Sequence, residues 1–173
     1  MYDAFVQVIG VFAFLILLIS FWQKDRKKIL FLQAVMSILY ALHYFLLGAY
    51  SGSIVNIIGI FRAYTFSKKN NNKLYSSNLV LYLFLVLFLV SGVITYDNIF
   101  SILPIIAALL YTLAIWNDKS STIRIGSLFV SCIWIIYNII VGSHVGYITE
   151  SILLISTALS VLKLDVKRKR SSL

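Results

Sequence analysis

The polar residues that could contact a solute are few in this sequence, and they lie inside long apolar runs. Glu150 is the one acid well inside such a run, and Asn56 is an amide inside another. A charged group at bilayer depth costs about 3 kcal/mol unless it is paired, so such residues are candidate functional residues by default. A carboxylate and an amide can both exchange hydrogen bonds with a polar solute, and we therefore treat both as candidate binding residues.

Further aromatic and polar side chains lie at a similar depth in two other apolar runs. They are Tyr40, His43, Trp134, Tyr137 and Asn138. We predict that they flank a solute pocket lined by Asn56 and Glu150. The structural alternatives stay open: the aromatic rings would belong to the belt at the membrane surface. His43 would satisfy a backbone carbonyl, and Asn56 and Glu150 would bond facing helices.

Three more residues are candidates for a gate or a hinge. Pro104 can bend a helix, and Gly10 occupies the matching position of the first apolar run, although a tolerated kink explains them equally well. Arg62 lies toward the basic end of its run, where we expect its side chain to extend to the membrane surface. The alternative for Arg62 is an inner gate or a contact with an anionic group of the solute.

Signatures of catalysis are absent from the sequence. It has no P-loop, glycine-rich dinucleotide turn, HExxH motif or Cys/His metal cluster. Glu150 has no second carboxylate to share acid–base work. Cys132 is the single cysteine, without an adjacent base or a partner for an internal disulfide. We therefore expect a protein that is not an enzyme and that binds no cofactor or metal.

The composition indicates the class of protein that contains these residues. Of the 173 residues, 61% are hydrophobic and 12% are charged, whereas soluble domains have about 45–50% apolar and about 25% charged residues. A soluble fold with so few polar residues could not cover its surface, and a disordered chain or a disulfide-rich secreted fold is excluded as well. The sequence predicts a polytopic membrane protein whose first partner is the lipid bilayer.

Seven apolar runs have the length that a membrane-spanning helix needs, which is about 20 residues. The runs are continuous rather than alternating, so they favour helices over the strands of a barrel. No basic residue precedes the first run, and we expect it to remain as a span rather than be cleaved as a signal peptide. We place the spans at 4–22, 29–47, 50–66, 77–95, 98–116, 123–141 and 145–163.

The positive charge is sorted onto one side of these spans. The chain has 15 Lys and Arg against 6 Asp and Glu, a net charge of +9, and the basic residues lie in or near the loops after the first, third and fifth spans and in the tail. The positive-inside rule makes this side cytoplasmic, with the N-terminus outside and the C-terminus inside. The basic run 167–170 is then a topology anchor on anionic lipid, and we expect no nucleic-acid partner.

A shift of 94 residues aligns the first three spans with the last three. It pairs 47–52 with 141–146, Trp22 with Trp116, and Asn56 with Glu150. We predict an all-α membrane protein with two parallel three-helix repeats, 1–66 and 96–163. A cytoplasmic loop and linker helix, 67–95, joins them, and a basic tail, 164–173, follows.

Four stretches of the sequence resemble the bacterial YgjV inner-membrane family. They are HYFLLG at 43–48, ILPII at 102–106, CIWIIYN at 132–138 and ESILL at 150–154. That family is similar in layout to SWEET sugar facilitators and PnuC vitamin transporters, which have 3+1+3 helices. The resemblance implies a transporter-like fold in the inner membrane but no substrate. SWEETs carry several prolines where this chain has one, and PnuC proteins carry a Trp-x-x-Trp motif where 134–137 reads WIIY.

These observations predict a small-solute transporter or facilitator of SWEET-like architecture that works by alternating access. Its substrate would be a small polar metabolite such as a sugar or a vitamin. The alternative is a non-transporting membrane interaction or sensor protein of the same fold. A transporter should have a cavity lined by Asn56 and Glu150, whereas a structural protein should fill that space with side chains. The sequence leaves open whether the chain forms a homo-oligomer.

Overall fold

The computed structural model describes residues 2–21, 26–69, 73–117 and 119–166, and it is all-helical over these ranges. The basic tail from 167 onward and the loop 22–25, to which we assigned topology charges, lie outside the described residues. The elements are α1 (Tyr2–Phe21), α2 (Arg26–Leu46), α3 (Tyr50–Ser67), α4 (Asn78–Ile94), the 3-10 helix η2 (Ile99–Ile102), α5 (Leu103–Trp116), α6 (Ser120–Ile140), α7 (His144–Ser160) and the π-helical turn η3 (Val161–Val166).

Each predicted span corresponds to one of these helices, with ends that differ by at most three residues when η2 and α5 are taken together. The predicted all-α fold is therefore confirmed. Three stretches of the described residues are long and apolar enough to cross a membrane, namely Ile99–Trp116, Ser121–Ile140 and His144–Lys163. Shorter apolar helices are Tyr2–Leu17, Ala34–Leu46 and Asn78–Ile94.

The outer surface of the bundle is apolar, as contact with lipid requires. Large hydrophobic side chains are more than half exposed on helices all around the bundle, for example Phe5 on α1, Val93 on α4 and Phe129 on α6. In water such a surface would be an aggregation or docking patch, but in a bilayer these side chains contact the lipid chains, where an apolar surface is favourable.

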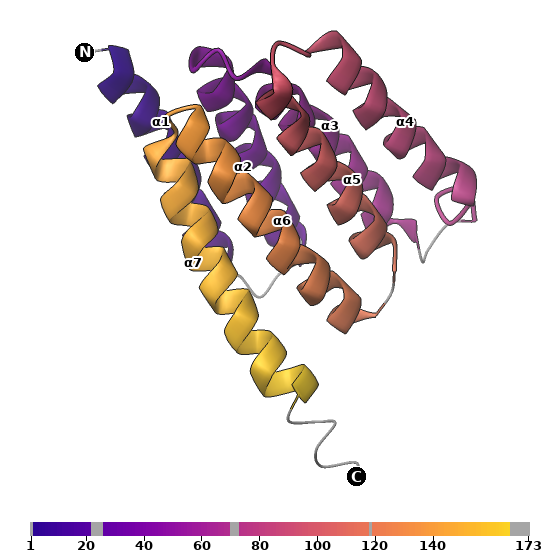
Figure 1. Ribbon diagram of the computed structural model, residues 1–173. Helices are drawn as coiled ribbons and strands as arrows, with labels where there is room; N and C mark the ends of the chain where they lie inside the picture. Colours follow the sequence, from indigo (N-terminus) through magenta and orange to yellow (C-terminus); the bar gives the residue numbers. More distant parts are fainter. Residues whose placement is uncertain (1, 22–25, 70–72, 118, 167–173) are drawn as a thin grey trace.

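The helices form two layers of three, α1–α2–α3 behind α5–α6–α7 in the view of Figure 1. The middle helix of each layer, α2 or α6, packs against both of its neighbours. The layers meet along two edges, where α3 packs on α5 and α1 packs on α7. Helix α4 lies at one edge of the bundle against α3 and α5 (Figure 1). This arrangement leaves α2 and α6 facing each other across the middle of the molecule.

The turns that follow the two middle helices have the same backbone hydrogen bonds at positions 94 residues apart. The Ala49 N–H donates to the Tyr44 carbonyl at 2.8 Å, and the Ser143 N–H donates to the Asn138 carbonyl at 2.9 Å. The helices before these turns, α2 and α6, also have 21 residues each. The two turns are therefore one local structure that occurs twice.

Each of these turns depends on a glycine in the left-handed conformation. Gly48 and Gly142 both have φ of +71°, which only glycine adopts without strain. We call the end of the bundle that holds these turns the glycine-turn end. The opposite end carries the short loops with Lys68, Lys69 and Lys119, and we call it the basic end.

Candidate functional site

A cavity of about 830 Å³ lies between the two layers. Its described lining residues come from α1, α2 and α3 on one side and from α5, α6 and α7 on the other, and none of them comes from α4. Four of the seven residues that we predicted to bind a solute line this cavity, namely Tyr40, Asn56, Trp134 and Glu150. Arg62, the candidate gate residue, lines it as well.

Asn56 and Glu150 reach the cavity from opposite layers, on α3 and on α7. Both side chains are partly exposed although they lie inside the bundle, because the cavity leaves one side of each uncovered. Asn56 donates from Nδ2 to the Gly52 carbonyl of its own helix at 2.9 Å. The Glu150 carboxylate accepts a hydrogen bond from the Ser131 side chain on α6. The cavity therefore has polar groups from both layers.

Aromatic rings form one wall of the cavity. Tyr44 stacks on Trp134 with ring centroids 5.6 Å apart and planes at 26°, and Tyr40 stacks on Tyr44 at 6.1 Å and 25°. Flat apolar faces of this kind can pack against a planar or ring-shaped solute. The alternative that assigned Tyr40 and Trp134 to the membrane-surface belt is wrong, since both rings face the interior.

The other three predicted binding residues form hydrogen bonds between the layers at the glycine-turn end and are not among the cavity-lining residues. We call these three residues and two of their partners the cross-layer network, which consists of His43, Tyr44, Tyr137, Asn138 and Ser143. The prediction that His43, Tyr137 and Asn138 line the pocket is therefore corrected. They are at the predicted depth, but they point at the facing layer and bond to it, and Asn138 keeps one buried nitrogen, Nδ2, without a partner among the described residues.

His43 shows this most completely, because it has no solvent exposure. Its Nδ1 lies 2.8 Å from the Val6 carbonyl, which can only accept, so Nδ1 must carry the proton. In the neutral ring, Nε2 then accepts from the Ser143 hydroxyl, 2.7 Å away. The structural alternative for His43, a bond to a backbone carbonyl, is the one that the structure supports.

The bonds of Tyr137 and Asn138 complete the network. The Tyr137 hydroxyl accepts from the Gly52 N–H at 3.2 Å, and it lies 3.1 Å from the Ser51 hydroxyl. Asn138 accepts from the Tyr44 hydroxyl at 2.7 Å through Oδ1. Beside the network, the Tyr40 hydroxyl donates to Thr149 at 3.1 Å. Together these contacts close the space between the layers at the glycine-turn end.

Arg62 is buried rather than extended to the membrane surface, with 8% of its surface exposed. Its Nη1 donates to the Thr112 hydroxyl at 2.8 Å and to the Ala108 carbonyl at 3.3 Å, both on α5. The guanidinium carbon lies 5.3 Å and 5.0 Å from the ring centroids of Phe88 and Tyr111. Our expectation of a surface-seeking side chain is wrong, because α5 and these rings stabilise the cation inside the bundle.

Comparison with known proteins identifies the family of this chain. Residues 4–168 match the model of the Imp-YgjV family, described as bacterial inner membrane proteins. The chain belongs to this family. It is 29% identical over 164 residues to the inner membrane protein YgjV of Escherichia coli (strain K12), a match that covers 95% of this chain and 86% of that protein. No solved structure matches the chain.

The two hinge candidates of this YgjV-family chain have packing roles in the structure. Pro104 lies in the first turn of α5, directly after η2, where a missing N–H costs no helical hydrogen bond. Gly10 lies within the continuous helix α1, and a Cβ there would approach the side chains of His43 and Val145 to 3.2 Å. Whether either residue also works as a hinge stays a prediction.

Sequence reasoning missed three hydroxyl residues that contact the predicted ones: Ser131, Thr149 and Ser143. A usable signal was the spacing on α6. Ser127, Ser131 and Trp134 are four and three residues apart, which places them on one helix face, and all three line the cavity. Hydroxyl residues are common in membrane helices, so their type alone does not mark a site.

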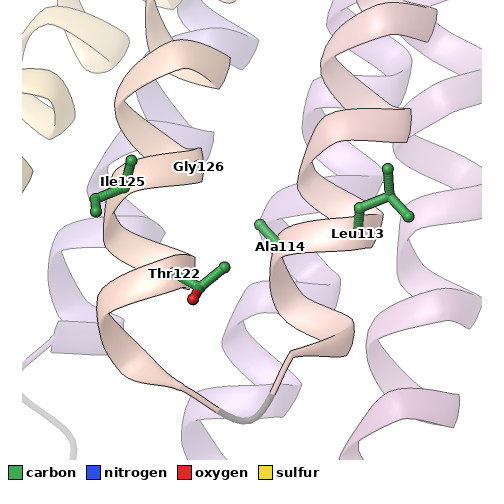
Figure 2. A pocket seen from close by; sticks show the side chains of 5 residues that line it. All are labelled: Leu113, Ala114, Thr122, Ile125 and Gly126. Carbon is green, nitrogen blue, oxygen red and sulfur yellow. The ribbon is translucent and has the colours of Figure 1, made fainter.

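A second, smaller depression lies between α5 and α6 near the basic end (Figure 2). Its lining residues are Leu113, Ala114, Thr122, Ile125 and Gly126. Ala114 points at Gly126 in Figure 2, and a Cβ at Gly126 would lie 2.6 Å from that of Ala114. The depression therefore marks a close helix contact, and its one hydroxyl gives a solute little to bind.

Proposed function

We propose that the chain is a small-solute transporter or facilitator rather than an enzyme, with the SWEET-like 3+1+3 layout and alternating access. The observation that carries this proposal is the cavity of about 830 Å³ lined by Asn56 and Glu150. Small-molecule sites occupy about 300–1,000 Å³, and a purely structural bundle would be more stable with that space filled. The solute is a small polar metabolite.

Two units that move against each other are the basis of the mechanism. Exchanging α1–α2–α3 with α5–α6–α7 would turn the contact of α3 on α5 into the contact of α7 on α1, and both contacts exist. The identical turns after α2 and α6 support the same relation. Residues 1–66 and 96–163 are then parallel repeats about an axis along the membrane normal, and 67–95 is the linker.

The conformation fits one stage of such a cycle. The cross-layer network closes the glycine-turn end, while the lining of the cavity continues toward the basic end as far as Phe31, Tyr64 and Thr157. The positive-inside rule places the basic end in the cytoplasm and the N-terminus outside. The conformation is thus closed to the outside, with its solute site on the cytoplasmic side of the network.

Uptake into proteoliposomes tests this proposal. Vesicles with the full-length chain should accumulate at least one solute from a panel of sugars and vitamins faster than empty vesicles do. Glu150→Gln and Asn56→Ala should lower this uptake by about tenfold, the effect of one lost hydrogen bond to a charged group. Asp97→Asn makes the same carboxylate-to-amide change at an exposed turn and should leave uptake unchanged.

Two results would contradict the proposal. If no solute moves although one stabilises the protein against heat, the chain binds without transporting, as a sensor would. If Glu150→Gln and Asn56→Ala both transport normally, the cavity is not the path of the solute.

A further inference from the structure

We propose that the solute is an organic anion and that Arg62 binds its negatively charged group, a carboxylate or a phosphate. This inference rests on the transport function proposed above and names the class of solute. It starts from an imbalance in the structure: Arg62 has more hydrogen-bond donors and more charge than the surrounding protein compensates.

The N–H donors of Arg62 are not all paired with acceptors of the described protein chain. A guanidinium has five N–H donors in a planar fork. Among the described residues, Nη1 alone finds acceptors, on Ala108 and Thr112, and Nε is buried without any partner. A buried donor left unpaired is costly. Two oxygens of a carboxylate or phosphate are the acceptors that match this fork best, because they can bind two of its N–H groups at once.

The charge is uncompensated as well. Within the part of the chain that the structure describes, Arg62 makes no ion pair, and Glu150 is the only acid that lines the cavity. Asn56, at the position that the 94-residue shift pairs with Glu150, is six residues before Arg62 on α3, which puts Arg62 about 9 Å nearer the basic end. A cation taken out of water is stabilised further when an anion pairs with it, so an anionic group of a solute can supply the ion pair that Arg62 lacks.

The space beside Arg62 suits such a solute. Gly59 and Ala107, which line the cavity near it, have little or no side chain and leave room for a ligand group. The stacked rings of Tyr44 and Trp134 lie on the wall of the same cavity. An anionic group is drawn to Arg62, so the solute enters in one orientation, with its charged group toward the basic end.

Direct binding to the purified full-length chain in nanodiscs tests this inference with three probes. Benzoate and phenyl phosphate carry an anionic group on a ring, and benzamide is their uncharged counterpart. The wild-type chain should bind the two anions about tenfold or more tighter than benzamide. Arg62→Gln should weaken anion binding by about 10- to 100-fold and leave benzamide unchanged, and Arg62→Lys should retain part of the affinity.

The matched control removes one positive charge elsewhere. Lys73 is exposed in the loop after α3, and Lys73→Gln should leave anion binding unchanged. Equal losses in Lys73→Gln and Arg62→Gln would mean that the probes bind the basic surface in general, and the inference would be wrong. Equal affinity of the wild-type chain for benzoate and benzamide would overturn it too.

A second variant pair covers the case that Arg62→Gln does not fold. A Cβ at Gly59 would lie 3.8 Å from Nη2 of Arg62, so Gly59→Asp places a carboxylate beside the guanidinium. That internal carboxylate should compete with benzoate and abolish its binding. Gly59→Asn fills the same space without the charge, so it should weaken benzoate binding at least tenfold less than Gly59→Asp does. Benzoate binding that survives in Gly59→Asp would overturn the inference.

The two proposals can fail separately. If benzoate binds through Arg62 but neither it nor any other solute crosses proteoliposomes, the anion site stands and the transport function fails. If neutral sugars are transported at the same rate by the wild type and by Arg62→Gln, transport stands and the anion inference is overturned.

Discussion

The Tyr44 hydroxyl donates a 2.7 Å hydrogen bond to Oδ1 of Asn138, and these two residues are 94 positions apart. The same shift relates the two glycine turns. If the two units are parallel repeats as proposed, a residue that contacts its own counterpart lies on the axis that exchanges them. This bond therefore marks the place where the layers meet face to face, and any motion that separates them at the glycine-turn end must break it.

Tyr44→Phe removes this bond and leaves Oδ1 of Asn138 without its donor inside the protein. We expect the free energy of unfolding to fall by about 1 kcal/mol and the melting temperature by about 2–4 °C. Thermal unfolding of the purified protein in detergent measures the shift. Tyr50→Phe removes a hydroxyl from an exposed ring on α3 and should change little. A shift of the same size in both variants would mean that the bond contributes nothing specific.

Gly146 gives a second prediction, because α7 can approach α6 closely only where it lacks a side chain. A Cβ at Gly146 would lie closer than 3 Å to the side chains of Asn138 and Ser143. Gly146→Ala should therefore destabilise the protein by about 1–3 kcal/mol. Gly59→Ala is the matched control: its nearest neighbour is Arg62 at 3.8 Å, and alanine is the better helix former. If Gly146→Ala melts at or above the temperature of Gly59→Ala, the close packing is not a constraint.

The helix positions could be predicted from the sequence, but the directions of the side chains could not. The length of an apolar run and the charges beside it are local properties, so the ends of helices such as α3 and α6 follow from them. Trp134 and Tyr137 are only three residues apart on α6, yet the first lines the cavity and the second bonds to α3. That difference depends on how the two layers pack.

Arg62 shows the same limit. Its place near the basic end of α3 favoured a side chain that extends to the surface. The Thr112 hydroxyl and the Tyr111 ring on α5 stabilise it inside instead, and these residues are 50 and 49 positions away in the sequence. A contact between distant positions cannot be inferred from the local pattern around either one.

Access to the cavity provides a third prediction, which also tests the orientation of the chain. Thr157 lines the cavity toward the basic end, and His144 is exposed at the glycine-turn end. Because Cys132 is exposed, the reporters are placed in a Cys132→Ser background. With a membrane-impermeant maleimide, Thr157→Cys should react in inside-out vesicles and His144→Cys in right-side-out vesicles. The reverse pattern would invert the topology, and labelling of Thr157→Cys from both sides would show that the network does not close the cavity.

His43 offers the last prediction, which separates a structural role from a binding role. Because its ring nitrogens join Val6 on α1 to Ser143 at the start of α7, His43→Leu removes one hydrogen bond from each partner and the link that the ring makes between them. The Ser143 oxygen still accepts from the Gly146 N–H, but its hydroxyl proton loses its acceptor. The free energy of unfolding should fall by about 2–3 kcal/mol, while the affinity for benzoate stays within about twofold of the wild type. Glu150→Gln should show the opposite pattern, with a changed affinity for ligands and a nearly unchanged stability. Melting curves and benzoate binding measured on the same preparations compare the two variants. A His43→Leu protein that melts normally but loses its affinity for benzoate would mean that His43 belongs to the solute site.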